Sequence, residues 1–237
     1  MTKRRNLGVV GVALAAALWA TQALAADAVL RSPNGQVVLR VARDGASFSL
    51  QRRGEAVLAP SPLGLDLAGE APLGRLVLEQ RRDEVQDRRI PLVATKAASA
   101  RDHYRGATLS FREQGGERRL LLDLRAYDDG VALRYRMEGS QPVQLAGERT
   151  GFVPAGDPSC LVSEAKPSHE VSFERARFSQ LRTDKPYDVP LVCATPSGRC
   201  CSPMLATTKP RRSIARICGA IPRTVGRCAA SPTASRR

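Results

Sequence analysis

Cysteine and histidine are the residue types in this sequence with the strongest potential for metal binding or nucleophilic chemistry. Five of the six cysteines lie towards the C-terminal end, at Cys193, Cys200, Cys201, Cys218 and Cys228. Their spacings of 7, 1, 17 and 10 match no two-residue zinc knuckle, and two adjacent cysteines cannot both serve an ordinary tetrahedral site. We therefore expect neither a metal site nor an evolved disulfide among these five cysteines.

Cys160 and the two histidines, His103 and His169, show no catalytic arrangement either. No residue near Cys160 supplies an activating base, so we interpret it as a small buried residue or a free thiol. Neither histidine has a partner at the spacing of metal ligands or of a nucleophile and its base. His103 stands in Arg101-Asp102-His103-Tyr104, just before an expected strand, where a structural hydrogen bond is the simpler interpretation.

The paired carboxylates of Asp128-Asp129-Gly130 are the remaining candidate for a cation or sugar site. Aspartate and glycine also supply the backbone geometry of a turn, and we favour a turn because apolar runs flank the triplet. The sequence therefore names no catalytic residue and no metal ligand, and it leaves the substrate-binding residues unknown.

The aromatic residues and the arginine pairs provide no further candidate site. Aromatic residues make up 4% of the chain, so rings on which a sugar could stack are scarce. The four tyrosines are Tyr104, Tyr127, Tyr135 and Tyr187, of which we expect Tyr135 to face a core. The arginine pairs fall at expected turns or next to acids, as is typical of a solvated surface; they lie at residues 52–53, 81–82, 88–89 and 118–119.

The formal net charge of +14 is concentrated at the two ends of the chain. Residues 1–25 carry three basic residues and residues 189–237 carry nine, without an acid in either segment, which leaves +2 for residues 26–188. A nucleic-acid-binding protein needs its basic residues on a folded face, so this distribution argues against nucleic acid as a partner. The central segment can form one core but is too short for a (β/α)₈ barrel, which needs about 250 residues.

Short antiparallel strands are the elements that must position the candidate residues. Apolar runs at residues 37–41 and 47–51 flank Asp44-Gly45, which is the strongest short-range signal for a hairpin. Arg53-Gly54 makes a second turn, and Leu63, Leu65 and Leu67 alternate as in a half-buried strand.

A second meander follows, with turns at Gly115-Gly116 and at residues 128–130. In residues 131–137 the odd positions are apolar, so Arg134 and Arg136 face away from the core. No helical stripe longer than two turns occurs in residues 26–188. We therefore predict an all-β fold, an antiparallel sandwich or barrel.

The first 25 residues have the three parts of a secretory signal peptide. A basic start at Lys3-Arg4-Arg5 precedes an apolar run at residues 7–20, and Ala23-Leu24-Ala25 precedes Ala26. The apolar run is shorter than the ~20 residues that span a bilayer as a helix. We expect export to the periplasm, cleavage after Ala25 and no stable membrane span; an uncleaved anchor is the alternative.

Five segments carry a family resemblance through their order along the chain. Residues 125–135, Arg-Ala-Tyr-Asp-Asp-Gly-Val-Ala-Leu-Arg-Tyr, are the most specific, and residues 32–35, 44–50, 61–65 and 101–111 accompany them. Together they resemble the N-terminal domain of glycoside hydrolase family 97, the SusB-like α-glucosidases and α-galactosidases. The likeness runs from about residue 29 to about residue 192.

The resemblance implies that residues 26–192 form an antiparallel β super-sandwich of the galactose-mutarotase-like type. In this family a (β/α)₈ barrel follows and carries the catalytic carboxylates beside a calcium ion. Glycoside hydrolysis needs two carboxylates placed across one glycosidic bond. We therefore expect the catalytic domain to be a missing partner of this chain, calcium to belong to the full-length relative, and no cofactor to bind here.

Residues 193–237 have a composition unlike that of a folded domain. Arg, Ala, Cys, Pro, Ser and Thr account for 35 of these 45 residues, and acids are absent. Read from the third base of each codon, Arg199-Cys200 can encode only Leu, Met or Val followed by Leu, as a further family strand would require. We interpret this tail as disordered, and as the product of a frameshift near codon 193 that removed the barrel.

The function expected from the sequence is that of an accessory domain of an exported α-glycoside hydrolase. It would help to shape the pocket for α-linked oligosaccharides and would be inactive alone, although its family is one of enzymes. The alternative is a stand-alone periplasmic module that binds carbohydrate or another envelope component, with the basic tail as a genuine extension.

Overall fold

The computed structural model describes the chain from residue 26 onward with gaps, so the signal-peptide prediction for residues 1–25 lies outside it. The described residues are 26–93, 96–139, 143–166, 168, 170–182, 184, 186–188, 191–194 and, as backbone, 200–207 and 213–223. Within these ranges all named strand pairs are antiparallel, and the helical structure is a single 3₁₀ turn, η1 (Phe178–Gln180). None of the described residues form a helix long and apolar enough to cross a membrane.

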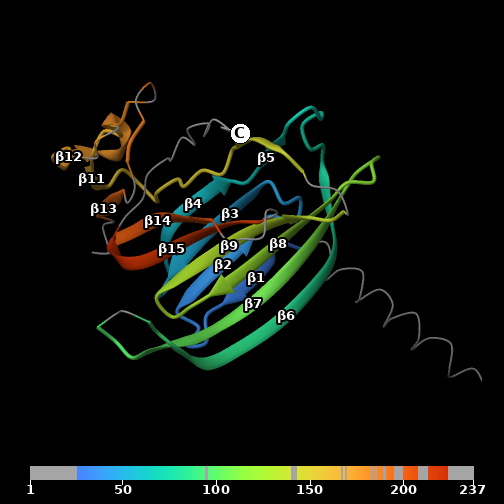
Figure 1. Cartoon of the computed structure of the whole chain (residues 1–237), viewed down its shortest axis with the longest axis horizontal. Helices are drawn as coiled ribbons and strands as arrows, with labels where there is room; N and C mark the ends of the chain where they lie inside the picture. Colours follow the sequence, from blue (N-terminus) through green and yellow to red (C-terminus); the bar gives the residue numbers. More distant parts are fainter. Residues whose placement is uncertain are drawn as a thin grey trace, which may run out of the picture.

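Two antiparallel sheets form the body of the fold (Figure 1). The four-stranded sheet has the order β1 (Ala28–Arg31), β2 (Val37–Val41), β3 (Ser47–Arg52), β4 (Glu55–Pro62). The six-stranded sheet has the order β14 (Cys200–Thr207), β15 (Ser213–Arg223), β9 (Gly130–Met137), β8 (Arg119–Ala126), β7 (Ser99–Glu113), β6 (Leu76–Pro91). Strands β1 and β2 pack across β7, β8 and β9. The predicted antiparallel sandwich is confirmed.

Two small sheets cover one end of the sandwich. One pairs β10 (Leu145–Glu148) with β5 (Leu65–Leu67). The other has the order β12 (Glu174–Arg177), β11 (Ser159–Val162), β13 (Val192–Ala194). These additions make the fold larger than a plain two-sheet sandwich, in keeping with the super-sandwich that the resemblance implies.

The core lies between the two main sheets and follows the period-2 alternation of the strands. Val131, Leu133 and Tyr135 are all buried, as the odd-position pattern predicts. Phe48 of the four-stranded sheet meets Phe152 edge to face, with ring centroids 5.7 Å apart. Aliphatic side chains of β7 and β8 belong to the same hydrophobic core.

The predicted hairpin turns are confirmed, and glycine is required at one of them for two reasons. Gly45 has φ +65°, in the left-handed region, and a Cβ at this position would lie 3.2 Å from a ring carbon of Phe111. At the next turn both Arg53 and Gly54 have positive φ values, which is the geometry of a two-residue hairpin loop.

Strands β6 and β7 continue beyond the rest of the sheet as a two-stranded arm. Strand β8 pairs with β7 from Arg105 to Arg112, whereas β6 and β7 remain paired as far as Pro91 and Ser99. We call residues 85–105 the β6–β7 arm. The interpretation of the arginine pairs at residues 81–82 and 88–89 as neighbours of acids holds, but their alternative placement at turns is wrong, because both lie inside β6.

About half of the tail that we predict to be disordered lies outside the described residues. Of its described parts, residues 193–194 belong to β13, and the backbone of β14 and β15 forms a hairpin paired to β9.

Candidate functional site

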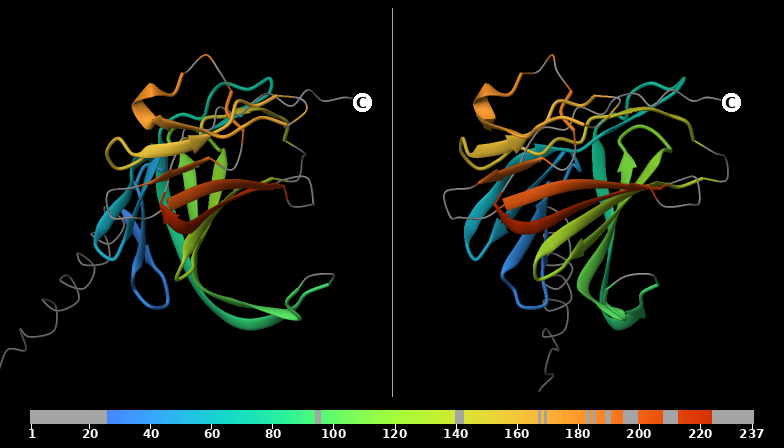
Figure 2. Two further views of the ribbon diagram at one scale, coloured as in Figure 1. Left: turned by 90° about the vertical axis from the view of Figure 1, so that its left-hand side faces the viewer. Right: turned by 60° about the vertical axis from the view of Figure 1, so that its left-hand side comes forward.

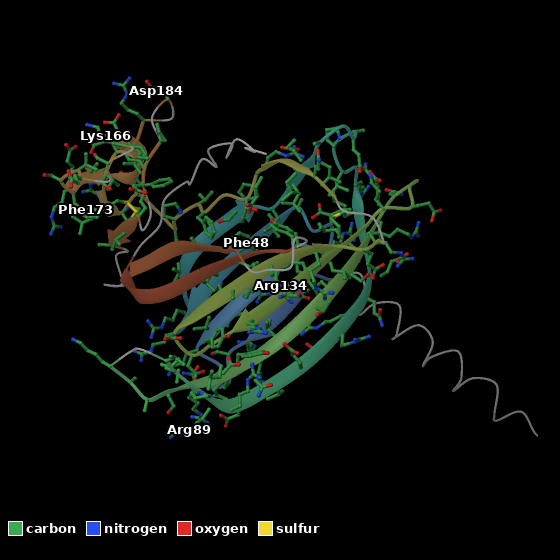
Figure 3. All side chains as sticks on the ribbon, viewed as in Figure 1. Phe48, Arg89, Arg134, Lys166, Phe173 and Asp184 are labelled. Carbon is green, nitrogen blue, oxygen red and sulfur yellow. A yellow bond between two sulfur atoms is a disulfide. The ribbon has the colours of Figure 1, made fainter. Side chains whose placement is uncertain are left out.

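The six-stranded sheet turns a charged face away from the core, which we call the outer face. Alternation along β8 and β9 puts Asp123, Arg134 and Arg136 on it, because the residues between them point into the core. In Figure 3, Arg134 lies on this face, whereas Phe48 lies between the sheets. The β6–β7 arm bends towards the same side, so the outer face is concave (Figure 2).

Asp123 is the centre of a network on the outer face. Its carboxylate accepts hydrogen bonds from Arg134 Nη2 at 2.7 Å, Arg136 Nη2 at 2.6 Å and Thr108 Oγ1 at 2.9 Å. Burial opposes ionisation of Asp123, but the bonds from Arg136, Arg134 and Thr108 outweigh it and lower the pKa of this carboxyl. Asp123 therefore stays ionised and is unsuited to donate a proton near neutral pH.

Glu79 makes a second network on the same face. Its carboxylate, which lies at a β-bulge between Leu78 and Gln80, forms ion pairs with both Arg112 and Arg119, the latter at 2.6 Å. The hydrogen bond from Arg112 is the main reason that the pKa of Glu79 is lowered. The outer face thus carries fixed ion pairs in which two guanidinium groups flank each carboxylate.

An aromatic cluster supports the base of the β6–β7 arm. The rings of Tyr104 and Tyr127 are 5.3 Å apart, and the guanidinium of Arg125 lies 4.4 Å above the Tyr104 ring. Asp102 accepts hydrogen bonds from Arg88 at 3.1 Å and from the Tyr127 hydroxyl at 3.3 Å. Because Tyr104 is buried beneath Arg125, its ring is not free to stack on a sugar.

Two adjoining clefts open at the edge of the sandwich, between the β2–β3 turn and the start of β6. We call the first, of about 240 Å³, the edge cleft; Arg43, Asp44, Arg75 and Gln114 and the aliphatic residues 76–78 line it. The second, of about 150 Å³, shares Asp44, Arg75 and Leu76 with it. Sequence reasoning missed these residues, because Arg75 and Gln114 approach Arg43 only through the packing of the two sheets.

The structure separates the polar candidates that the sequence suggests. Residues 128–130 form the predicted turn, in which Tyr127 N donates to Gly130 O at 2.8 Å. Asp128 also accepts a hydrogen bond from Asn34 N at 2.9 Å, which ties this turn to the β1–β2 turn. His103 lies opposite Asp87 in the arm, and the hydrogen bonds of the described residues do not include the one we expect for its side chain. His169 lies outside the described residues.

The cysteine predictions hold only in part. Cys160 is buried, as one of the two interpretations of it predicts, but it is not a free thiol. It is joined to Cys193, so the expectation that Cys193 takes part in no disulfide is wrong. They lie opposite one another on β11 and β13, and both are buried. Sequence spacing could not pair them, since 33 positions separate them and the pairing of β11 with β13 brings them together.

The expectation that calcium belongs to the full-length relative and that no cofactor binds here stays a prediction. The described residues contain no group of three or more histidine, cysteine, aspartate or glutamate side chains arranged to hold a metal ion. On the outer face, arginines hold the carboxylates of Asp123 and Glu79.

Comparison with known proteins places this geometry in a family. The model of the glycosyl-hydrolase 97 N-terminal domain matches residues 30–204. A retaining alpha-galactosidase of Bacteroides thetaiotaomicron is 25% identical over 162 residues, which are 66% of this chain and 24% of that protein. The chain therefore spans about a quarter of the curated relative.

Solved structures share the fold at low sequence identity. A glycoside hydrolase family 97 enzyme of Pseudoalteromonas sp. strain K8, in complex with panose, has a TM-score of 0.66 at 14% identity, covering 84% of this chain and 34% of that one. A beta-arabinopyranosidase has a TM-score of 0.66 at 18% identity, covering 82% and 38%. With the family model matched over most of its length, the chain belongs to the glycosyl-hydrolase 97 N-terminal family.

Proposed function

We propose that this chain is the accessory domain of an α-glycoside hydrolase, which acts by packing against a catalytic domain and shaping its substrate pocket. The observation that carries the proposal is the family match over residues 30–204, together with coverage of 24–38% of the relatives' own chains. In those relatives most of the chain lies outside this domain. The substrate class we propose is α-linked oligosaccharides, by analogy with the family.

The electrostatics of the described carboxylates support an accessory role. A glycosidase needs one carboxylic acid with a raised pKa as proton donor. The five described carboxyls whose pKa departs from its ordinary value all depart downward, and they are Glu79, Asp87, Glu113, Asp123 and Asp157. We therefore keep the prediction that the catalytic residues belong to another domain.

The β6–β7 arm supports docking to a larger partner. Four exposed aliphatic side chains gather within nine residues of it, and they are Val85, Ile90, Leu92 and Val93. A lone two-stranded ribbon is marginally stable in water, and exposed apolar clusters of this kind mark interaction surfaces. We propose that the arm and the concave outer face together contact the catalytic domain.

Turnover by the purified chain tests the accessory role. We expect no hydrolysis of p-nitrophenyl α-galactoside or α-glucoside above the rate without protein. Hydrolysis that disappears in the Asp123→Asn and Glu79→Gln variants would refute the proposal, because it would mean that this chain holds a catalytic pair.

We further propose that the chain is exported and that its basic tail arises from a shifted reading frame. The signal-peptide pattern supports export, and so does the buried Cys160–Cys193 disulfide, because such bonds persist in oxidising compartments. The family match extends to residue 204, which is past the codon 193 near which the sequence pattern puts the proposed shift.

Resequencing from codon 180 to beyond codon 237 tests the shifted frame. We expect an alternative frame that continues for several hundred codons with the βα alternation of a barrel. A stop codon without coding potential downstream would favour a stand-alone module that binds carbohydrate or another envelope component. N-terminal sequencing of the periplasmic protein tests export, and a start at Ala26 is expected.

A further inference from the structure

We propose that the edge cleft binds an acidic sugar, a hexuronic acid unit that carries one carboxylate and several hydroxyl groups. This inference goes beyond the proposed function, which concerns neutral α-glycosides and the docking of a catalytic domain. It stands on the shape, the charge and the supporting contacts of the cleft.

The shape of the cleft suits one sugar ring. Its volume is about 240 Å³, and the first residues of β6, Leu76, Val77 and Leu78, give it an aliphatic side. Val77 is 44% exposed, so an apolar surface is open to the C–H face of a sugar. Arg43, Asp44, Arg75 and Gln114 supply polar groups around it. Ligand sites commonly combine an apolar surface with a few polar groups in this way.

The two arginines of the cleft have their guanidinium groups available. Within the described residues, neither the Arg43 nor the Arg75 side chain has a hydrogen-bond or ion-pair partner, whereas Arg112 and Arg134 are held by carboxylates. A guanidinium offers a planar set of N–H donors that matches a carboxylate. The lining therefore presents donors for an anion.

Asp44 gives the cleft an acceptor and sets its net charge. Its Oδ1 accepts a hydrogen bond from Ala46 N at 3.1 Å, which holds the side chain in the β2–β3 turn. The other carboxylate oxygen can accept a bond from a sugar hydroxyl. Two guanidiniums and one carboxylate leave one net positive charge, which matches a ligand with a single negative charge better than it matches a dianion.

The segment that carries Arg75 is held in place before any ligand binds. Glu113 accepts hydrogen bonds from Gly74 N at 2.6 Å and from Arg118 Nη2 at 2.6 Å. Arg118 also donates to Ala71 O at 2.7 Å. On the opposite side of the cleft, the Gly45 N–H donates to Ala42 O at 2.8 Å, and the positive φ of Gly45 shapes the turn that carries Arg43. A preorganised site loses less free energy to ordering on binding.

Titration of the full chain with sodium galacturonate and sodium glucuronate, followed by calorimetry or NMR shifts, tests the proposal. We expect millimolar binding of at least one uronate at low salt, and weakening as NaCl is added. Galactose and glucose should bind at least tenfold more weakly. Arg43→Ala and Arg75→Ala should each weaken uronate binding at least fivefold, whereas Arg31→Ala, which removes an exposed arginine from β1, should leave it unchanged.

Three results would overturn the proposal. Absence of uronate binding would do so, as would binding that Arg43→Ala and Arg75→Ala leave intact. Inorganic phosphate that competes as strongly as the uronate would reduce the cleft to a general anion site. None of these results bears on the accessory role, which is tested by turnover of neutral α-glycosides.

Discussion

Arg134 of β9 lies directly opposite Asp123 of β8, and its guanidinium Nη2 is 2.7 Å from the carboxylate. Arg136 approaches the other oxygen of the same carboxylate from one pleat further along β9, at 2.6 Å. Alternation in the sequence predicts only that the two arginines face outward. The pairing of β8 with β9 brings both of them to Asp123, where they form a fixed ion-pair network. The network covers the middle of the concave outer face.

Replacing Asp123 by asparagine should destabilise the fold. The change leaves two half-buried guanidiniums without their carboxylate, and unpairing such charge-assisted bonds costs about 1–3 kcal/mol. Urea unfolding should show a lower midpoint with an unchanged slope. Glu55→Gln, at an exposed position in the β3–β4 hairpin, is the control and should have little effect.

The stability of the protein should fall as the pH falls below about 4. Arg118 and the Gly74 N–H lower the pKa of Glu113 to about 2, and the pKa of Asp123 is also lowered. Carboxyls with a depressed folded pKa stabilise the fold above their unfolded pKa, and this contribution is lost as pH falls through the folded value. Glu113→Gln should flatten the loss of unfolding free energy between pH 4.5 and pH 2. An unchanged slope would argue against the Glu113 contacts.

Loss of the Cys160–Cys193 disulfide should lower stability markedly. The bond joins two residues that are 33 positions apart. The chain-entropy model predicts that such a crosslink adds about 3–4 kcal/mol to the free energy of unfolding. Thermal unfolding should shift down on addition of dithiothreitol. The Cys160→Ser/Cys193→Ser double variant should already unfold at the lower temperature, and dithiothreitol should not lower its unfolding temperature further. Peptide mapping without reductant should recover the linked pair.

Gly45→Ala should be more harmful than Gly54→Ala. Both glycines have positive φ, so each substitution carries about 1 kcal/mol of backbone strain. At Gly45 the new Cβ also meets the Phe111 ring at 3.2 Å, whereas at Gly54 nothing lies within 4 Å. The difference between the two unfolding free energies measures the packing penalty alone, and equal values would contradict the close approach.

The β-strands were predictable where local pattern and turn chemistry agree. Asp44-Gly45, Arg53-Gly54 and residues 128–130 are turns in the structure, and the odd positions of residues 131–137 are buried. Strand β6 was missed, because eight of its 16 residues are charged and its second half extends beyond the sheet, where neither face needs to be apolar. Period-2 hydrophobicity signals a strand only if one of its faces is buried.

By itself the sequence determined the fold class, the position of most hairpin turns and the family resemblance, because alternation and turn geometry are local properties of the chain. The tertiary structure alone decided which side chains lie next to one another. Asp123 is bound by two arginines, Cys160 pairs with Cys193, and Arg75 reaches the cleft beside Arg43, each across a strand register or a sheet edge. Spacing along the chain does not encode these distances, since a register shift of one residue would turn every side chain to the other face.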